Sequence, residues 1–247
     1  MRALTLAALL ATAAPAMALD LTQMSDADKA AFNAQIRDYL LENPQVLVEA
    51  MQVLEDREAE AQAARDVDLI AANRDSLFND PDSWSGGAEE PDITIVEFLD
   101  YRCGYCKRAH PEVAALIEDD PNIRIVVKEF PILGEASVLA SRFAIATRLV
   151  AGDEAYKQVS DALMTMRGDV TEPALTRLGN TLGIETEEVL ARMNSDEVSR
   201  IITENRELAQ AMGLTGTPSF VMENRMLRGY APLAAMQQMV DEIRAEG

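Results

Sequence analysis

Residues 93–106 decide the fold, and they read Ile-Thr-Ile-Val-Glu-Phe-Leu-Asp-Tyr-Arg-Cys-Gly-Tyr-Cys. The first seven are mostly β-branched or apolar and cover the length of one strand, so Ile93 to Leu99 predict a buried strand. Residues 104–119 predict a helix kinked at Pro111, and Ile123 to Phe130 predict a second strand. A strand, a helix and a strand of these lengths predict a βαβ unit with parallel strands and a right-handed crossover.

The chain has two cysteines, and only three positions separate them. A structural disulfide between Cys103 and Cys106 would close a very short loop, and short loops gain the least stability from a crosslink. A Cys-x-x-Cys pair between a strand and a helix is instead a redox motif. The unpaired N–H groups and partial positive charge of the helix start favour a thiolate at Cys103. We therefore expect Cys103 to attack substrate disulfides and the more buried Cys106 to resolve the mixed disulfide.

A zinc site is the competing reading of the cysteine pair. Structural zinc takes four ligands, and the whole chain offers two cysteines and one histidine. His110 lies four residues after Cys106, so it could reach the same helical face as a ligand or an acid/base group, or simply be solvated or capping. We expect no metal held within one chain, and no cofactor beyond the redox-active disulfide Cys103–Cys106.

The chain begins with the pattern of an export signal. Arg2 is followed by an apolar run from Leu4 to Leu10, which is too short to span a membrane, and Ala16-Met17-Ala18 is a small-x-small cleavage site. We expect residues 1–18 to be removed after Ala18 and the mature chain to be exported without stable membrane insertion. The formal net charge of −20 argues against a nucleic-acid partner, because a phosphate backbone requires a basic surface.

Residues 19–75 predict a helical stalk that is interrupted at Asn43-Pro44. Ser25 and Asp28 resemble a capping box at its start. A narrow apolar stripe on such polar helices cannot bury itself alone, so it must pack on the main domain or on copies of itself. We favour self-association. The members of the stripe are Phe32, Ile36, Tyr39, Leu40, Leu47, Met51 and Leu54.

The rest of the chain divides into a linker and two kinds of domain. The turn-rich residues 76–92 predict a linker. Residues 93–135 and 213–247 predict an α/β domain, and the helical residues 136–212 predict an insertion within it. The C-terminal part predicts a hairpin over Ser219–Met222 and Met226–Arg228, and a last helix from Pro232 to about Ala245.

Thr217-Pro218 enters the hairpin. The proline is either an ordinary strand-initiating residue or the site of a cis peptide bond.

Together, the strand, Cys-Gly-Tyr-Cys, helix, strand, helical insertion, Gly216-Thr-Pro218, hairpin and helix resemble the thioredoxin-fold DsbA superfamily over residues 91–245. The resemblance implies an α/β thioredoxin fold with an inserted helical domain and a cis-proline loop beside the cysteines. Thr217 and Pro218 then bind substrate, as we also expect for Gly104 and Tyr105. It further implies that Glu97, six residues before Cys103, relays protons to the resolving thiol, and Lys128 is its expected partner.

With the helical N-terminus included, the chain is similar to the ScsC (suppressor of copper sensitivity) group of periplasmic proteins. This similarity implies a periplasmic homo-oligomer, with a trimer favoured. The expected partners are unfolded or misoxidised exported proteins and a membrane electron-transfer protein that acts as reductant.

Three functions compete. Cys-Gly-Tyr-Cys with Thr before the proline is similar to the DsbC isomerases, so a disulfide isomerase or reductase is favoured. The alternative is a dithiol oxidase in the manner of DsbA. The third is a binding protein, either a holdase or a copper(I) carrier, because soft thioether ligands suit copper(I), although methionine at helical spacing is more often core. The methionines concerned are Met164, Met166, Met193 and Met212.

Overall fold

The computed structural model describes residues 24–246, so the expected signal peptide lies outside the described part. The chain divides into two compact units, residues 1–58 and 59–247. In the first unit, α1 (Asp26–Glu42) precedes the beginning of α2 (Gln45–Ala72), and no residue of α1 is buried. Ser25 caps α1 as predicted, since its hydroxyl accepts a hydrogen bond from the backbone N–H of Asp28. Every helix within residues 24–246 is too short or too polar to cross a membrane.

The end of α2 belongs to the second unit, so the predicted stalk boundary at residue 75 lies too far along the chain. Ile70 is buried in the core, and both oxygens of Asp66 accept hydrogen bonds of 2.7 Å from the Arg228 guanidinium. No local pattern marks this change, because one uninterrupted helical pattern runs through both the exposed and the covered part.

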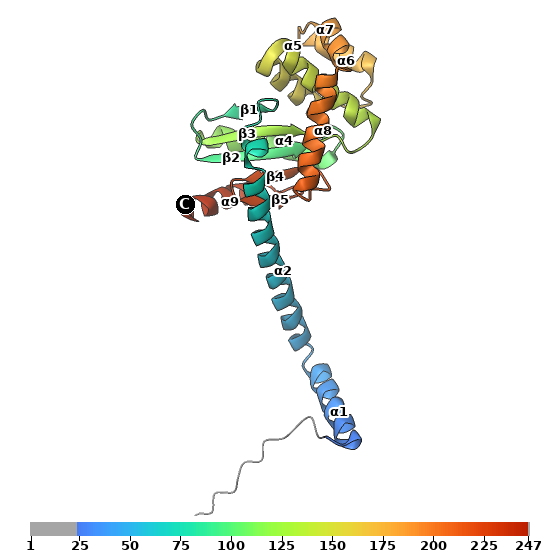
Figure 1. Ribbon diagram of the computed structural model, residues 1–247, viewed down its shortest axis with the longest axis vertical. Coiled ribbons are helices and arrows are strands. Elements are labelled where there is room, and N and C mark those ends of the chain that lie inside the picture. Colours follow the sequence, from blue (N-terminus) through green and yellow to red (C-terminus); the bar gives the residue numbers. More distant parts are fainter. Residues whose placement is uncertain (1–23, 247) are drawn as a thin grey trace, which may run out of the picture. The chain divides into compact units, whose positions relative to one another are not determined.

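The second unit is built on a five-stranded mixed sheet in the order β1-β3-β2-β4-β5 (Figure 1). As predicted, β2 and β3 are parallel neighbours, with Ile93 opposite Ile123. The pairs β1–β3, β2–β4 and β4–β5 are antiparallel. The strand bounds are β1 Trp84–Gly87, β2 Ile93–Leu99, β3 Ile123–Glu129, β4 Ser219–Met222 and β5 Arg225–Arg228.

Strand β1 corrects the prediction of a linker over residues 76–92. Trp84 lies opposite Val127 in the sheet, and its ring stacks on Tyr156 with centroids 5.8 Å apart. The glycines that suggest a turn serve close packing here. A Cβ on Gly86 would lie 2.4 Å from the Trp84 ring, and one on Gly87 would lie 2.3 Å from the Ile123 carbonyl oxygen. Small residues thus let this edge strand approach its neighbours closely.

Helices cover both faces of the sheet, which explains why all seven residues of β2 are buried. Helices α4, α5 and α9 pack on one face, and the end of α2, α3 and α8 pack on the other. The insertion is helical as predicted, and its long helix α5 breaks at Gly152, whose φ is 85°. The helix bounds are α3 Arg74–Phe78, α4 Gly104–Asp119, α5 Glu135–Thr165, α6 Glu172–Thr181, α7 Thr186–Arg192, α8 Asp196–Ala211 and α9 Leu233–Glu246.

Candidate active site

The two cysteines lie where β2 passes into α4. Cys103 is the N-cap residue of α4, and its backbone N–H donates to the Asp100 carbonyl at 3.0 Å. Its side chain retains 7% exposure, whereas Cys106 is fully buried one turn later, and both are free thiols. The two sulfurs therefore differ in access, with Cys103 nearer the surface, as the motif predicts.

The electrostatic surroundings of the two sulfurs differ as well. Cys103 stands beside the unpaired N–H groups at the helix start, which stabilise negative charge. Burial raises the pKa of the Cys106 thiol far above its ordinary value, and the charges of Cys103 and Glu97 raise it further. Cys106 thus holds its proton until a group close by removes it.

The Thr217–Pro218 peptide bond is cis, and its loop lies against the cysteines. The Cys103 Sγ donates a hydrogen bond of 3.1 Å to the carbonyl oxygen of Thr217, a residue 114 positions away in the chain. Pro218 is buried, and Ser219 behind it opens β4. The fold therefore brings together the two features that the sequence singles out separately.

Exposed apolar side chains lie on two segments next to the catalytic turn. Gly104 is exposed, and a Cβ added there would have no other atom within 4 Å. Tyr105 is 61% exposed, with its ring 6.1 Å from that of Tyr230. Ile132 and Leu133, which carry no motif in the sequence, are also exposed. Their only advance signal is an apolar pair in a loop between Pro131 and Gly134.

The buried carboxylate of Asp100 fixes this loop to the catalytic turn. Its Oδ2 accepts hydrogen bonds from the backbone N–H groups of Ile132 and Leu133, at 2.8 and 3.1 Å. Its Oδ1 accepts one from the Arg102 N–H at 2.8 Å. The Asp100 side chain thus fixes the loop that carries Ile132 and Leu133 to the turn that precedes Cys103.

Glu97 lies in the middle of β2 and is buried, with an exposed fraction of 3%. Its Oε1 has no hydrogen-bond partner within residues 24–246. Burial raises the pKa of Glu97 to about 8, with a smaller contribution from the negative charge of Glu129. The carboxyl can therefore accept and return a proton near neutral pH, as its expected relay role requires.

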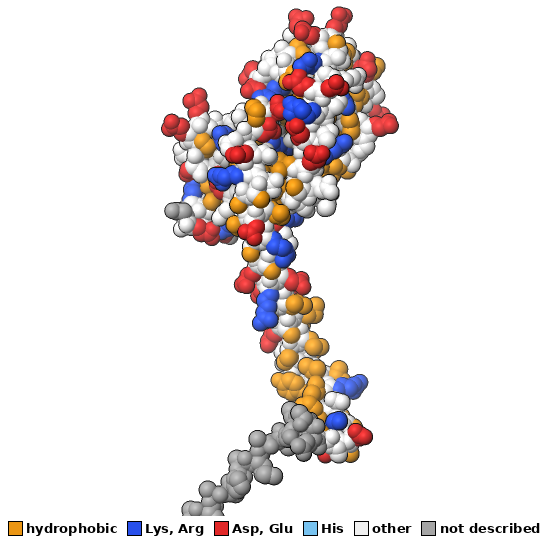
Figure 2. Space-filling model, in the orientation of Figure 1, with side chains coloured by type: hydrophobic (Ala, Val, Ile, Leu, Met, Phe, Trp, Pro, Cys, Tyr) orange, Lys and Arg blue, Asp and Glu red, His pale blue; other side chains and the backbone are white. Residues whose placement is uncertain are grey.

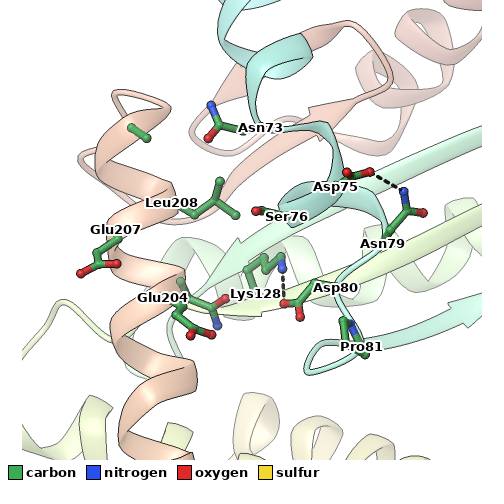
Figure 3. Close-up of a pocket in the computed structure, with 12 residues that line it drawn as sticks. Asn73, Asp75, Ser76, Asn79, Asp80, Pro81, Lys128, Glu204, Glu207 and Leu208 are labelled. Atoms are coloured by element: carbon green, nitrogen blue, oxygen red, sulfur yellow. Dashed lines mark hydrogen bonds and ion pairs between the residues drawn. The ribbon is translucent and has the colours of Figure 1, made fainter.

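Lys128 is not the partner of Glu97, which corrects that prediction. In the sheet, Glu97 lies opposite Val127 and Lys128 lies opposite Phe98, so the two side chains point to opposite faces. Lys128 Nζ instead contacts Asp80 Oδ2 at 2.5 Å, beside the groove between α3 and α8 (Figure 3). Lys128 is 1% exposed and structurally paired, far from the cysteine side of the sheet.

A second buried acid, Glu129, occupies the face where Lys128 was expected. Its Oε1 accepts from the hydroxyls of Tyr101 and Tyr156 at 2.7 Å each, and its Oε2 accepts from Ser141 at 2.7 Å. Burial raises the pKa of Glu129 to about 7 although the three donors oppose this. The sequence signal was a charged residue at the end of an apolar strand, which alone does not tell which face it occupies.

The structure also places the residues behind the zinc and copper(I) interpretations. His110 Nε2 lies 3.0 Å from Asp161 Oδ1, and burial lowers the pKa of His110 despite that carboxylate. No cluster of three or more His, Cys, Asp or Glu side chains within residues 24–246 is suited to a metal ion. Met164, Met193 and Met212 are buried in the core, as methionines at helical spacing usually are.

Most of the chain is similar to known protein families and solved structures. Residues 94–241 match the family described as DSBA-like thioredoxin domain, and residues 28–61 match the Copper resistance protein ScsC N-terminal domain. A thioredoxin-like oxidoreductase from Silicibacter pomeroyi is 43% identical, with a TM-score of 0.66 over 70% of this chain and 98% of that chain. Proteus mirabilis ScsC in a transitional conformation is 26% identical, with a TM-score of 0.66 over 92% of this chain and 100% of that chain.

Sequence relatives also include part of a much longer protein. Na(+)/H(+) antiporter NhaA 3 of Salinispora tropica is 25% identical over 154 residues, which are 62% of this chain and 24% of the antiporter. The chain thus spans about a quarter of the length of the curated relatives that it matches.

Proposed function

Because the chain belongs to the DSBA-like thioredoxin domain family and is ScsC-like, we propose that it exchanges thiols and disulfides on exported proteins, chiefly as a disulfide isomerase or reductase. One observation carries the proposal: the sulfur at the start of α4 lies 3.1 Å from the carbonyl before the cis-proline. A substrate strand that pairs with the Thr217 backbone would bring its own sulfur next to Cys103.

The chemistry needs no group beyond the two cysteines and the substrate. The Cys103 thiolate attacks one sulfur of a substrate disulfide, a new S–S bond forms, and the other substrate sulfur leaves and takes up a proton. In reduction, Cys106 loses its proton and attacks Cys103, which releases the reduced substrate and leaves a Cys103–Cys106 disulfide. In isomerisation, a substrate thiol attacks instead and the dithiol is recovered without net oxidation.

The first unit supports the choice of isomerase. It carries many exposed apolar side chains, which Figure 2 shows gathered over α1 and the start of α2. Helices with this much uncovered apolar surface associate with copies of themselves, and we propose a homo-oligomer, with a trimer favoured. Several nucleophiles around one client raise the effective concentration of each. The side chains are Phe32, Ile36, Tyr39, Leu41, Leu47, Val48, Met51, Val53 and Leu54.

The same proposal includes a cellular location, a class of clients and a reductant. Export after cleavage at Ala18 would place the protein in the periplasm, where unfolded and misoxidised proteins are its clients. An isomerase must stay reduced, so a membrane electron-transfer protein is the proposed reductant. The exposed Tyr105, Ile132 and Leu133 give such clients an apolar surface beside the reactive sulfur.

Refolding of scrambled ribonuclease, with light scattering on the same sample, tests the proposal. The mature chain should restore ribonuclease activity and scatter as an oligomer, whereas Cys103→Ala should lose turnover. A holdase would keep its effect in Cys103→Ala, and a dithiol oxidase would reoxidise reduced ribonuclease but leave the scrambled form unchanged. Its potential would then lie near the strong-oxidant value of about −120 mV.

A truncation separates the units. A chain that begins at residue 59 keeps Asp66 and Ile70 in place, so it should fold as a monomer with reductase activity but little isomerase activity. If this truncation still sediments as the intact oligomer, the first unit is not what assembles the chains.

A further inference from the structure

A small cavity lies on the Glu97 side of the sheet, between β2, α4 and α5. Its volume is about 50 Å³, and its polar lining includes Glu97, His110, Ser160 and Asp161 among apolar walls. This volume has room for at least one water molecule, and the lining offers such a molecule several hydrogen-bond partners. One of these partners is the buried Glu97, whose Oε1 is unsatisfied within the described residues.

Two of the other polar groups of the cavity, His110 and Asp161, reach solvent. His110 and Asp161 side chains are 23% and 42% exposed, and His110 Nε2 lies 3.0 Å from Asp161 Oδ1. Lys157 Nζ holds both oxygens of Asp161 at 2.6 Å, which fixes the carboxylate at this end of the cavity. His110 lies one helical turn after Cys106 on α4, so the helix that carries the resolving thiol also carries the group at the cavity mouth.

We propose that His110 and Asp161 form the solvent end of a proton path whose inner end is Glu97. This inference rests on the proposed thiol–disulfide exchange and concerns its resolving step. When Cys106 attacks Cys103 in a molecule whose Glu97 is ionised, the Cys106 proton passes to the Glu97 carboxylate, the Cys103–Cys106 bond forms, and the bond from Cys103 to the substrate breaks. The substrate leaves as a thiolate, and Glu97 then passes the proton across the cavity to His110 and on to solvent.

Within residues 24–246, the other groups around Glu97 give its proton no comparable path to solvent. Glu129 accepts hydrogen bonds from Tyr101, Tyr156 and Ser141, which enclose it. Burial lowers the pKa of His110, so its imidazole is neutral at pH 7 and able to take up a proton. The titratable groups near Glu97 are Cys103, Cys106 and His110 on or beside α4, Glu129 on β3, Tyr101 in the turn, and Tyr156, Lys157 and Asp161 on α5.

The test isolates the resolving step in the full mature chain. Reduced protein is mixed with oxidised glutathione, quenched in acid and weighed by mass spectrometry. The adduct on Cys103 forms at a rate proportional to the glutathione concentration, and its loss by Cys106 attack does not depend on that concentration. In His110→Gln, we expect adduct formation at the wild-type rate and adduct loss slowed at least about fivefold near pH 7. Glu204→Gln, an exposed ion-pair variant on α8, should match the wild type in both steps.

Glu97→Gln supplies the decisive comparison. If the path runs through Glu97, removing His110 in the Glu97→Gln background should slow adduct loss no further. The inference is overturned if His110→Gln loses the adduct at the wild-type rate, or if its slowing is the same in both backgrounds. His110→Asn provides a second variant should His110→Gln not fold. Failure of the wild-type chain to form any adduct would instead refute the proposed function itself.

Discussion

Two buried ionisable residues on neighbouring strands have opposite surroundings. Lys128 on β3 is 1% exposed and contacts Asp80 at 2.5 Å, whereas Glu97 on β2 is 3% exposed and its Oε1 has no partner within residues 24–246. An unpaired buried carboxyl costs stability, and a paired buried ion recovers part of its desolvation penalty. The sheet thus keeps its satisfied ion on the face away from the cysteines and its unsatisfied acid on the cysteine side.

The difference separates a structural from a functional use of burial. Lys128 and Asp80 connect β3 to the segment after α3, and neither approaches the sulfur atoms. The negative charge of Glu97 raises the pKa of the Cys106 thiol, and the Glu97 side chain lines the cavity between β2, α4 and α5. Unfavourable burial that also shifts a pKa toward neutrality is typical of a group that moves protons.

The largest expected effect is on the pH dependence of stability in Glu97→Gln. The folded chain holds the Glu97 proton up to a pKa of about 8, whereas an unfolded carboxyl releases it near 4.5. Between these pH values the folded state binds the extra proton, so the free energy of unfolding falls as pH rises, by up to about 1.4 kcal/mol per unit. Glu97→Gln lacks this loss and should become more stable than the wild type as pH rises from 5 to 8.

Urea unfolding of the reduced proteins at several pH values measures this effect. The exposed variant Glu204→Gln should give a curve parallel to that of the wild type. Parallel curves for Glu97→Gln and the wild type would mean that Glu97 titrates alike in the folded and unfolded chains, and the contrast with Lys128 would disappear.

A smaller effect is expected on the opposite face. Asp80→Asn leaves the Lys128 ammonium buried without a charged partner and should lower the free energy of unfolding by about 2–3 kcal/mol at pH 7. Lys128→Met should cost less, because Asp80 is 20% exposed and keeps hydrogen bonds from Asp82 and Ser83. Denaturant unfolding measures both changes.

The rate of Cys103 alkylation tests whether the Lys128–Asp80 ion pair acts on the thiols. Neither Asp80→Asn nor Lys128→Met should alter it, since the pair lies across the sheet from the thiols. A slower alkylation in either variant, with the fold intact, would show that this ion pair does act on the site.

Much of the fold could be predicted from local pattern. The parallel β2 and β3, the helix that starts at the cysteines, the helical insertion and the final hairpin all follow from apolar periodicity and turn residues. Strand β1 could not, because Ser85, Gly86 and Gly87 suggest a turn and pair with β3 only through tertiary packing. The end of the stalk was likewise hidden, since α2 is one helix in both units.

The candidate site could likewise be predicted only in part. The resemblance to the DsbA superfamily implied a cis-proline loop beside the cysteines, and the structure places the Thr217 carbonyl oxygen 3.1 Å from the Cys103 sulfur. The pairing of Glu97 with Lys128 was wrong, since it depended on strand register, and one residue of register moves a side chain to the other face. The same uncertainty concealed Glu129 as the acid that does share the face of Glu97.

The smallest expected effect tests that second acid. The negative charge of Glu129 raises the pKa of Glu97, so Glu129→Gln should lower the pH at which Glu97 releases its proton, by about half a unit to one unit. The infrared carboxyl band that disappears in Glu97→Gln reports this pH directly. Ser141→Ala serves as the matched control, because it removes one hydrogen bond to Glu129 but leaves both carboxyls in place. If the Glu97 band titrates at the same pH with and without Glu129, burial alone sets its proton affinity and the two acids on this face act independently.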